Sequence, residues 1–253
     1  MSTTRRVVRR KECNVITAEM FNAPGLEATE PIGPDAPVRL TGAVLVLHDS
    51  VIESGKGIGH HPHRGNERLF YLLSGGLHHD DALNNITADA TAGDLAIFTE
   101  GRRGMIHAES NPADEDARIW IIVAPTEPMP ERATVRVLEA ADAGFHAADG
   151  VEVKEIVGGA SPAQIHSDVR WLADVRLEAG ARFTRERGAG EAVVIQPIGG
   201  RVRAMDEDLE TDDLLAVGPD DPDGAIDVST DGASARVLIA VTGPGVGFEV
   251  NAA

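Results

Sequence analysis

Short runs of apolar residues, each ended by glycine, aspartate or proline, recur along most of the chain. One run covers Val38 to Val51 and reads VRLTGAVLVLHDSV, and it is followed by RLFYLLSGG, DLAIFTEG and ARIWIIVAP. Runs of this length that are rich in β-branched residues are typical of buried strands. Many short strands joined by tight turns indicate an antiparallel barrel or sandwich. The pattern therefore predicts an all-β protein.

A proline-rich segment divides these runs into two series. Residues 125–132 read PTEPMPER and contain three prolines, which remove backbone donors and should end the sheet. The second series extends from GVEVKEIVGG to ARVLIAVTG and repeats the plan of the first at domain scale. Such a repeat predicts two related antiparallel β-barrels. We expect an N-terminal domain at residues 1–130, and a connector with a C-terminal domain at residues 131–253.

Composition agrees with this architecture and narrows the possible partners. Of the 253 residues, 27 are glycine and 14 are proline, which suits a fold with many turns. The net charge of −18 should repel nucleic-acid backbones. Basic residues gather near the start, at Arg5, Arg6, Arg9, Arg10 and Lys11. We interpret this segment as a solvated, partly disordered terminus rather than a nucleic-acid-binding arm.

The cysteine content and the length of the apolar runs indicate in which cellular compartment the protein is expected. Cys13 is the only cysteine, which excludes an intrachain disulfide and a cysteine-built zinc or iron–sulfur site. No apolar run approaches the roughly 20 residues that a membrane span needs. The arginine-rich start also lacks the apolar segment of a secretory signal. We therefore expect a cytoplasmic protein that binds neither membranes nor nucleic acid.

Histidines are crowded into the first half of the chain, where seven of the nine occur. His61 and His63 are two positions apart, as are His107 and Glu109, and such pairs point to the same face of a strand. If that face lines the barrel interior, three imidazoles and one carboxylate converge. This donor set suits divalent Fe, Mn, Ni, Cu, Co or Zn. The spacing predicts one metal site built from these four residues.

Two stretches, GHHPHRGNERLFYLLSGGLHHDDALNN and TAGDLAIFTEGRRGMIHAESNP, closely resemble the pirin family of bicupins. The shared pattern is His-Pro-His-Arg-Gly, a glutamate, an apolar strand ending at glycine, a Gly-Asp turn, a segment rich in Thr, Gly and Arg, and His-x-Glu. In this chain these elements are His61, Pro62, His63, Arg64, Gly65, Glu67, Gly75, Gly93, Asp94, Thr99, Gly101, Arg102, Gly104, His107 and Glu109. The resemblance covers roughly residues 55–125, and the second half matches only in general plan.

The resemblance implies two tandem cupin barrels of the jelly-roll type. It also implies a single iron, Fe(II), held by His61, His63, His107 and Glu109. The second series of strands has no His-x-His or His-x-Glu pair, so we expect the C-terminal barrel to be metal-free. The chain departs from the family pattern at Asn66, where an aromatic residue is usual. The turn before His107 is one residue longer than usual, at Gly101-Arg102-Arg103-Gly104, and the segment after Glu109 is shorter. These departures leave the ligands in place and change the pocket wall.

Glu67 is the rival of Glu109 for the role of carboxylate ligand. It shares strand parity with His61 and His63, and most cupins draw their glutamate from this first motif. The pirin pattern favours Glu109, and Glu67 could then orient a histidine ligand by a hydrogen bond to its other ring nitrogen.

The remaining histidines have other expected places. His60 has the opposite parity to His61 and should face outward or into a loop. His78 and His79 follow a Gly-Gly pair, and we expect solvated loop residues there rather than an accessory site. His48 lies among buried-strand residues, so we expect it to be hydrogen-bonded, and it could approach the pocket.

The resemblance also implies an activity, because some pirin-like bacterial proteins cleave flavonols. The first hypothesis is a metal-dependent dioxygenase of the quercetin 2,3-dioxygenase type, acting with O₂ on a small polyphenolic or enol substrate. Glu109, with Glu67 as the rival, would accept the substrate proton. The alternative is a non-enzymatic, redox-responsive metal protein that binds a regulatory protein partner, for which the acidic surface is suitable. A third option is a metal-bound scaffold that has lost activity.

Overall fold

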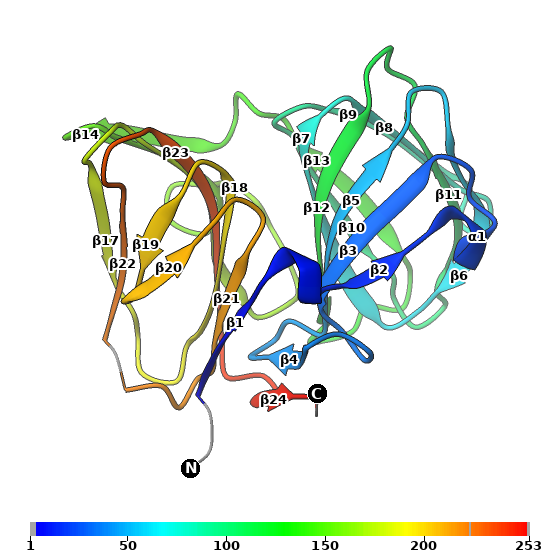
Figure 1. The fold of residues 1–253 in the computed structure, drawn as a ribbon. Coiled ribbons are helices and arrows are strands. Elements are labelled where there is room, and N and C mark those ends of the chain that lie inside the picture. Colours follow the sequence, from blue (N-terminus) through cyan, green and yellow to red (C-terminus); the bar gives the residue numbers. More distant parts are fainter. Residues whose placement is uncertain (1–3, 223, 252–253) are drawn as a thin grey trace.

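The computed structural model describes residues 4–222 and 224–251 and consists mainly of antiparallel β-sheets (Figure 1). This confirms the all-β class expected from the sequence. The helices in these residues are short: η1 (Arg10–Glu12) is a 3₁₀ turn and α1 (Ala18–Phe21) a single α-helical turn. No helix in the described part of the chain has the length and apolar character needed to cross a bilayer.

The first half of the chain forms two sheets that pack face to face. The larger contains β2 (Asn14–Ile16), β3 (Leu26–Ile32), β4 (Val38–Thr41), β5 (Val46–Ile52), β7 (Asn66–Ser74), β10 (Leu95–Thr99), β12 (Ala117–Pro125), β13 (Thr134–Leu138) and β24 (Phe248–Val250). The smaller contains β6 (Gly57–His63), β8 (Gly76–Asp81), β9 (Ile86–Thr91) and β11 (Met105–Ser110). Phe70 and Ile121 of the larger sheet share a buried cluster with Leu77 and Met105 of the smaller.

The second half repeats this arrangement with a seven-stranded and a four-stranded sheet. The larger contains β1 (Arg5–Val8), β14 (Gly144–Ala148), β15 (Val151–Val157), β16 (Val169–Leu177), β18 (Ala192–Gly199), β21 (Leu214–Val217) and β23 (Ala235–Thr242). The smaller contains β17 (Arg182–Glu186), β19 (Val202–Ala204), β20 (Glu207–Leu209) and β22 (Ala225–Ser229). Their facing side chains form a second buried cluster that includes Trp171, Phe183 and Ile226.

The two large sheets also pack against each other, which explains why their strands are apolar without interruption. Along β12, Ile119, Ile121 and Val123 belong to the cluster inside the N-terminal half. The alternate residues Trp120 and Ile122 belong to a third cluster, shared with side chains of the C-terminal sheet such as Leu172, Val194 and Leu238. A strand buried on both faces has no polar alternation to show in its sequence. The molecule is therefore a stack of four sheets.

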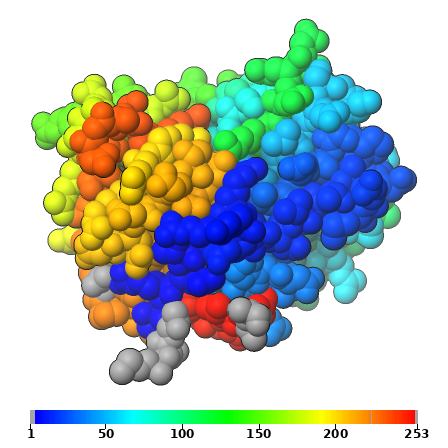
Figure 2. All heavy atoms as spheres, in the orientation of Figure 1, coloured from blue at the N-terminus to red at the C-terminus, as the bar shows by residue number. Residues whose placement is uncertain are grey.

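The expectation of a solvated N-terminus is wrong for Arg5–Val8. These residues form β1, which pairs antiparallel with β21 of the C-terminal half. Val8 is fully buried there, and Arg5 forms an ion pair of 2.6 Å with Asp221. In the space-filling view, the dark-blue N-terminal segment lies over the junction between the two halves (Figure 2). The segment is therefore held in the fold by the burial of Val8 and by the ion pair of Arg5.

Candidate metal centre

Two neighbouring strands of the smaller N-terminal sheet carry the four residues expected to bind metal. β6 and β11 pair antiparallel, with His107 opposite His61 and Met105 opposite His63. The register shifts between His107 and Glu109, so that Glu109 lies opposite Ile58. Because side chains two apart share a face of a strand, both pairs point into the N-terminal half, as the spacing required.

The structure brings these side chains together at one point. The ring centroids of His61, His63 and His107 lie 4.6–5.0 Å from one another. One donor nitrogen from each lies within 4.8 Å of the others. Glu109 Oε1 is 2.8 Å from His107 Nδ1, and its Oε2 is 3.9 Å from His61 Nε2. This histidine triad can bind a metal ion, since metal–nitrogen bonds of roughly 2.0–2.1 Å need donors that are this close.

His79 joins this group, and the expectation that it is a solvated loop residue is wrong. It lies on β8 with 1% of its surface exposed, and its Nδ1 is 3.3 Å from His107 Nδ1. His79, His107 and Glu109 form a second, fully buried trio of possible ligands. The signal in the sequence was strand parity, because His79 alternates with Leu77, which is also buried. His78 points the other way and contacts Asp89 at 2.7 Å.

Several polar atoms in the cluster are buried without a hydrogen-bond partner among the described residues. They are Nε2 of His79, Nε2 of His107 and Oε2 of Glu109. Leaving such an atom unpaired costs about 1–3 kcal/mol. Unpaired atoms on side chains whose possible ligand atoms lie within 4.8 Å of one another fit a bound cation. The residues present therefore fit a divalent metal.

The electrostatic environment favours the neutral form of three histidines in the cluster and the ionised form of Glu109. Burial, and after it the Arg68 guanidinium, lower the pKa of His63 to about 2. Burial also lowers the pKa of His61, and that of His79 to about 4. Burial alone would raise the pKa of Glu109, but the hydrogen bond from His107 and the nearby imidazoles lower it overall. Neutral imidazoles and an ionised carboxylate are what metal binding requires.

Arg68 is a polar neighbour of the cluster that the sequence pattern did not single out. Its Nη2 lies 2.7 Å from His63 Nδ1, and its Nε donates to Glu100 Oε1 at 2.6 Å. Glu100 is fully buried and also accepts a hydrogen bond from the backbone of Asn66. A permanent cation, neutralised by its own carboxylate, is thus fixed beside the candidate site.

Glu67, the rival carboxylate, points away from the histidines. It is fully buried and accepts hydrogen bonds from the Thr99 hydroxyl, the Ser167 hydroxyl and the backbone N–H groups of His166 and Ser167. β6 ends at His63 and β7 begins at Asn66, with the Arg64–Gly65 turn between them. The rule that alternate residues share a face holds within one strand, so it does not place Glu67 on the side of His61 and His63. Glu67 connects the two halves of the molecule.

The histidines open onto a cavity of about 250 Å³ inside the N-terminal half. Its walls are mostly apolar and come from β3, β5, β6, β7, β12 and the N-terminal segment: Ile16, Phe21, Leu26, Ala28, Val46, Ile52, Ile58, Phe70, Ile119, Ile121 and Val123. Its other lining residues are Glu30, His48, Ser50, His61, His63, Arg68, His107 and Glu109. An apolar cavity with a few convergent polar groups is the usual form of a small-molecule site.

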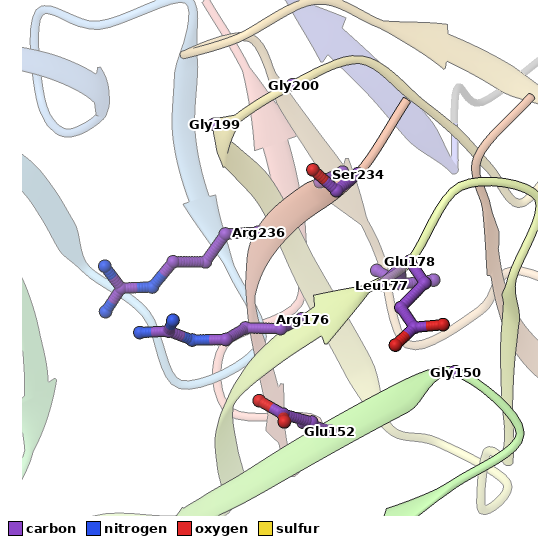
Figure 3. Close-up of a pocket in the computed structure, with 10 residues that line it drawn as sticks. Gly150, Glu152, Arg176, Leu177, Glu178, Gly199, Gly200, Ser234 and Arg236 are labelled. Carbon is purple, nitrogen blue, oxygen red and sulfur yellow. The ribbon is translucent and has the colours of Figure 1, made fainter. Parts of the chain in front are cut away.

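A second cavity, of about 490 Å³, lies in the C-terminal half (Figure 3). Arg176 and Arg236 lie opposite each other on β16 and β23 and extend side by side, with Glu152 below them in this view. Arg236 is already paired with Asp174 at 2.6 Å. Among the described residues that line this cavity, none is a histidine or a cysteine. Its charged side chains, which include Glu152, Arg176 and Arg236, have both signs, and its lining lacks the histidine cluster of the first cavity.

Two halves that each consist of two facing sheets, one of them with a histidine cluster, are the arrangement of a bicupin with one candidate metal centre among the described residues. A family model described as pirin matches residues 35–122. A putative quercetin 2,3-dioxygenase of Pasteurella multocida is 30% identical over 177 residues, which cover 68% of this chain and 72% of that protein. The chain belongs to the pirin family of bicupins. The expected family membership and bicupin fold are thereby confirmed.

Other relatives match over shorter parts. A quercetin 2,3-dioxygenase of Escherichia coli is 38% identical over 84 residues, which are 32% of this chain and 36% of that protein. The chain thus matches about a third of that relative's length.

The crystal structure of YhhW from Escherichia coli has the same fold, with a TM-score of 0.78, 23% identity, and coverage of 95% of this chain and 98% of that one. A nickel(II) complex of YhhW is similar, with a TM-score of 0.76, 23% identity and coverage of 95% and 99%.

Proposed function

We propose that the protein is a metal-dependent dioxygenase of the quercetin 2,3-dioxygenase type, acting with O₂ on a small polyphenolic or enol substrate. The observation that carries this proposal is the histidine triad with Glu109 at the polar end of an apolar cavity, where His107 and Glu109 each have a buried, unpaired atom. The names of several relatives, which describe quercetin 2,3-dioxygenases, support the same reaction class.

His61, His63, His107 and Glu109 would hold the metal, which we take to be Fe(II), while the donor set also suits Ni, Mn, Co, Cu and Zn. When bound, the metal would supply a Lewis-acid and redox centre for the substrate and O₂. Glu109 lines the cavity beside the ligating histidines and is the proposed acceptor of the substrate hydroxyl proton. Glu67 accepts hydrogen bonds from Thr99 and Ser167 and does not line the cavity. This favours Glu109 both as the carboxylate ligand and as the proton acceptor.

The apolar walls have their own part in this chemistry. Phe70, Ile119 and Ile121 face the cavity, so an aromatic substrate can bury its rings against them while its oxygens meet the polar end. Exclusion of water from this space strengthens the electrostatic interactions of Glu109 and the histidines. The cavity is thus suited to a mostly apolar molecule with oxygen substituents at one end.

The test is elemental analysis combined with O₂ uptake in the presence of quercetin. We expect about one metal ion per chain in the wild type, and loss of both metal and uptake in His61→Ala and Glu109→Ala. His78→Ala is the matched control, because His78 lies in the same sheet and pairs with Asp89 outside the cluster. Absence of metal in the wild type after reconstitution would refute the proposal. Metal without O₂ uptake would favour the alternative, a non-enzymatic metal protein with a regulatory partner.

A further inference from the structure

The wall of the metal cavity contains a second polar group, formed by His48 on β5 and Glu30 on β3. His48 Nε2 lies 2.8 Å from Glu30 Oε2, and Glu30 Oε1 accepts a hydrogen bond from Asn14 Nδ2 at 3.2 Å. Glu30 is 7% exposed, and the His48 side chain is 20% exposed. Both line the cavity, whose other walls here are Ile16, Ala28 and Val46.

The sheet register places this pair at a distance from the histidine cluster. Ile121 of β12 lies opposite His48 on one side and opposite Phe70 of β7 on the other. Neighbouring strands are about 4.8 Å apart, so His48 and Phe70 are on the order of 10 Å apart across the sheet. Arg68, two residues before Phe70, contacts the metal-site residue His63. The cavity floor therefore extends from the candidate metal centre over Phe70 and Ile121 to His48.

Local backbone structure is adapted to hold the Glu30 carboxylate in this place. The register between β3 and β5 shifts between Thr29 and Ile32, where Glu30 turns into the cavity. A Cβ at Gly33 would collide with the end of the Glu30 side chain, which would have to move, so the glycine leaves room for the carboxylate in its present position. A hydrogen-bonded polar pair buried among apolar residues contributes little net stability, because it replaces hydrogen bonds that both groups make to water. A ligand is the better reason for a pair in this position.

The tautomer of His48 determines what the pair can bind. Because the Glu30 carboxylate accepts, His48 Nε2 carries the proton, and Nδ1 is left as an acceptor in the neutral ring. An acceptor at an apolar wall is complementary to a hydroxyl donor. Ser50, two residues further along β5, adds a hydroxyl to the same wall.

We propose that the His48–Glu30 pair is a substrate subsite that accepts a hydrogen bond from a hydroxyl at the end of the substrate remote from the metal. This inference rests on the proposed function and narrows its substrate class. The substrate is an elongated polyphenol with adjacent oxygens at the metal end and a phenolic hydroxyl at the opposite end, beyond Phe70 and Ile121.

The experiment compares two flavonols on the metal-loaded protein without O₂, with dissociation constants measured by absorbance titration. Quercetin carries hydroxyls on its remote ring, whereas 3-hydroxyflavone keeps the 3-hydroxy-4-keto pair that binds metals and lacks every other hydroxyl, those of the remote ring included. We expect the wild type to bind quercetin about tenfold more tightly than 3-hydroxyflavone. His48→Leu should bind both compounds alike, with its affinity for 3-hydroxyflavone unchanged.

Two further variants make the test specific. The double variant His48→Leu/Glu30→Gln removes the carboxylate that the single change leaves buried and unpaired, and should give the same loss of preference. His78→Leu replaces a histidine that also pairs with a carboxylate, Asp89, outside the cavity, and should keep the preference.

Failure of the subsite and failure of the proposed function give different results. If the His48 variants retain the wild-type preference while metal and quercetin are bound, the subsite is refuted and the dioxygenase proposal stands. Equal binding of the two flavonols by the wild type refutes the subsite in the same way. If the wild type takes up no metal, or binds neither flavonol, the proposed function fails and the subsite fails with it.

Discussion

Arg68 is the side chain in the candidate metal centre whose contacts compete with a metal. A guanidinium has donors only, so its contact with His63 makes Nδ1 the acceptor and leaves the ring proton on Nε2. A metal that binds through Nδ1 must displace Arg68. A metal that binds through Nε2 needs the proton to move to Nδ1, which again requires Arg68 to leave. Metal binding and the Arg68 contact therefore exclude each other.

This competition predicts tighter metal binding when Arg68 is neutralised. Arg68→Gln alone would leave Glu100 buried without its partner, so the informative variant is Arg68→Gln/Glu100→Gln. We expect it to bind a divalent metal about tenfold more tightly than the wild type, because His63 is freed and a nearby cation is removed. Competition with a chromophoric chelator measures the affinity. An affinity equal to or below that of the wild type would show that Arg68 supports the site.

The spacing of the ligands, and a hydrogen-bonded His48 near the pocket, could be predicted from the sequence, whereas the contacts of Arg68 and Glu30 could not. His61 with His63, and His107 with Glu109, follow the two-residue period of a strand, which needs no tertiary information. Arg68 and Glu30 acquire their contacts through strand register and a shift in β3, which pairwise spacing does not encode. The choice between Glu67 and Glu109 stays a prediction until the metal is measured.

At the scale of single elements, β1 shows how charge and burial together fix a terminal strand. Val8 is fully buried in the cluster between the two large sheets. Arg9 Nη1 lies 2.7 Å from Asp213, and Arg10 Nη1 lies 3.0 Å from Asp212. The basic start of the chain thus meets the acidic loops of the C-terminal half. Apolar runs could be predicted as strands, but the strand that each one would pair with could not.

Val8→Ala tests whether β1 is part of the folded core. Removing two methyl groups from this fully buried position should lower the free energy of unfolding by about 2 kcal/mol. Val15→Ala in β2 is the control, because Val15 is 47% exposed and its change should stay within about 0.5 kcal/mol. Urea denaturation measures both. Equal, small effects would mean that residues 5–8 are a solvated tail in solution.

At the scale of the whole molecule, the two β series of the sequence are joined by more than their connector. β1 pairs with β21 and β24 pairs with β4, so each end of the chain adds a strand to the opposite half. Between the large sheets, Tyr71 donates to Asp174 at 2.7 Å and Trp120 donates to Gln196 at 2.6 Å. The repeat predicted two series of strands, because each series has its own turns and apolar runs. These exchanges between the halves leave no periodic signal and could not be predicted.

The domain boundary near residue 130 stays a prediction, and the strand exchanges determine how it can be tested. β13 begins at Thr134 yet pairs with β10, so a cut at residue 130 removes edge strands from both halves. It also exposes the apolar faces that the two large sheets share. We therefore expect residues 1–130 and residues 131–253, produced separately, to lack a cooperative thermal transition. Co-expression should restore an associated complex with a single transition, measured by circular dichroism after size-exclusion chromatography. A separate fragment 1–130 that unfolds cooperatively and retains metal would instead show that the N-terminal half folds without the exchanged strands and the shared core.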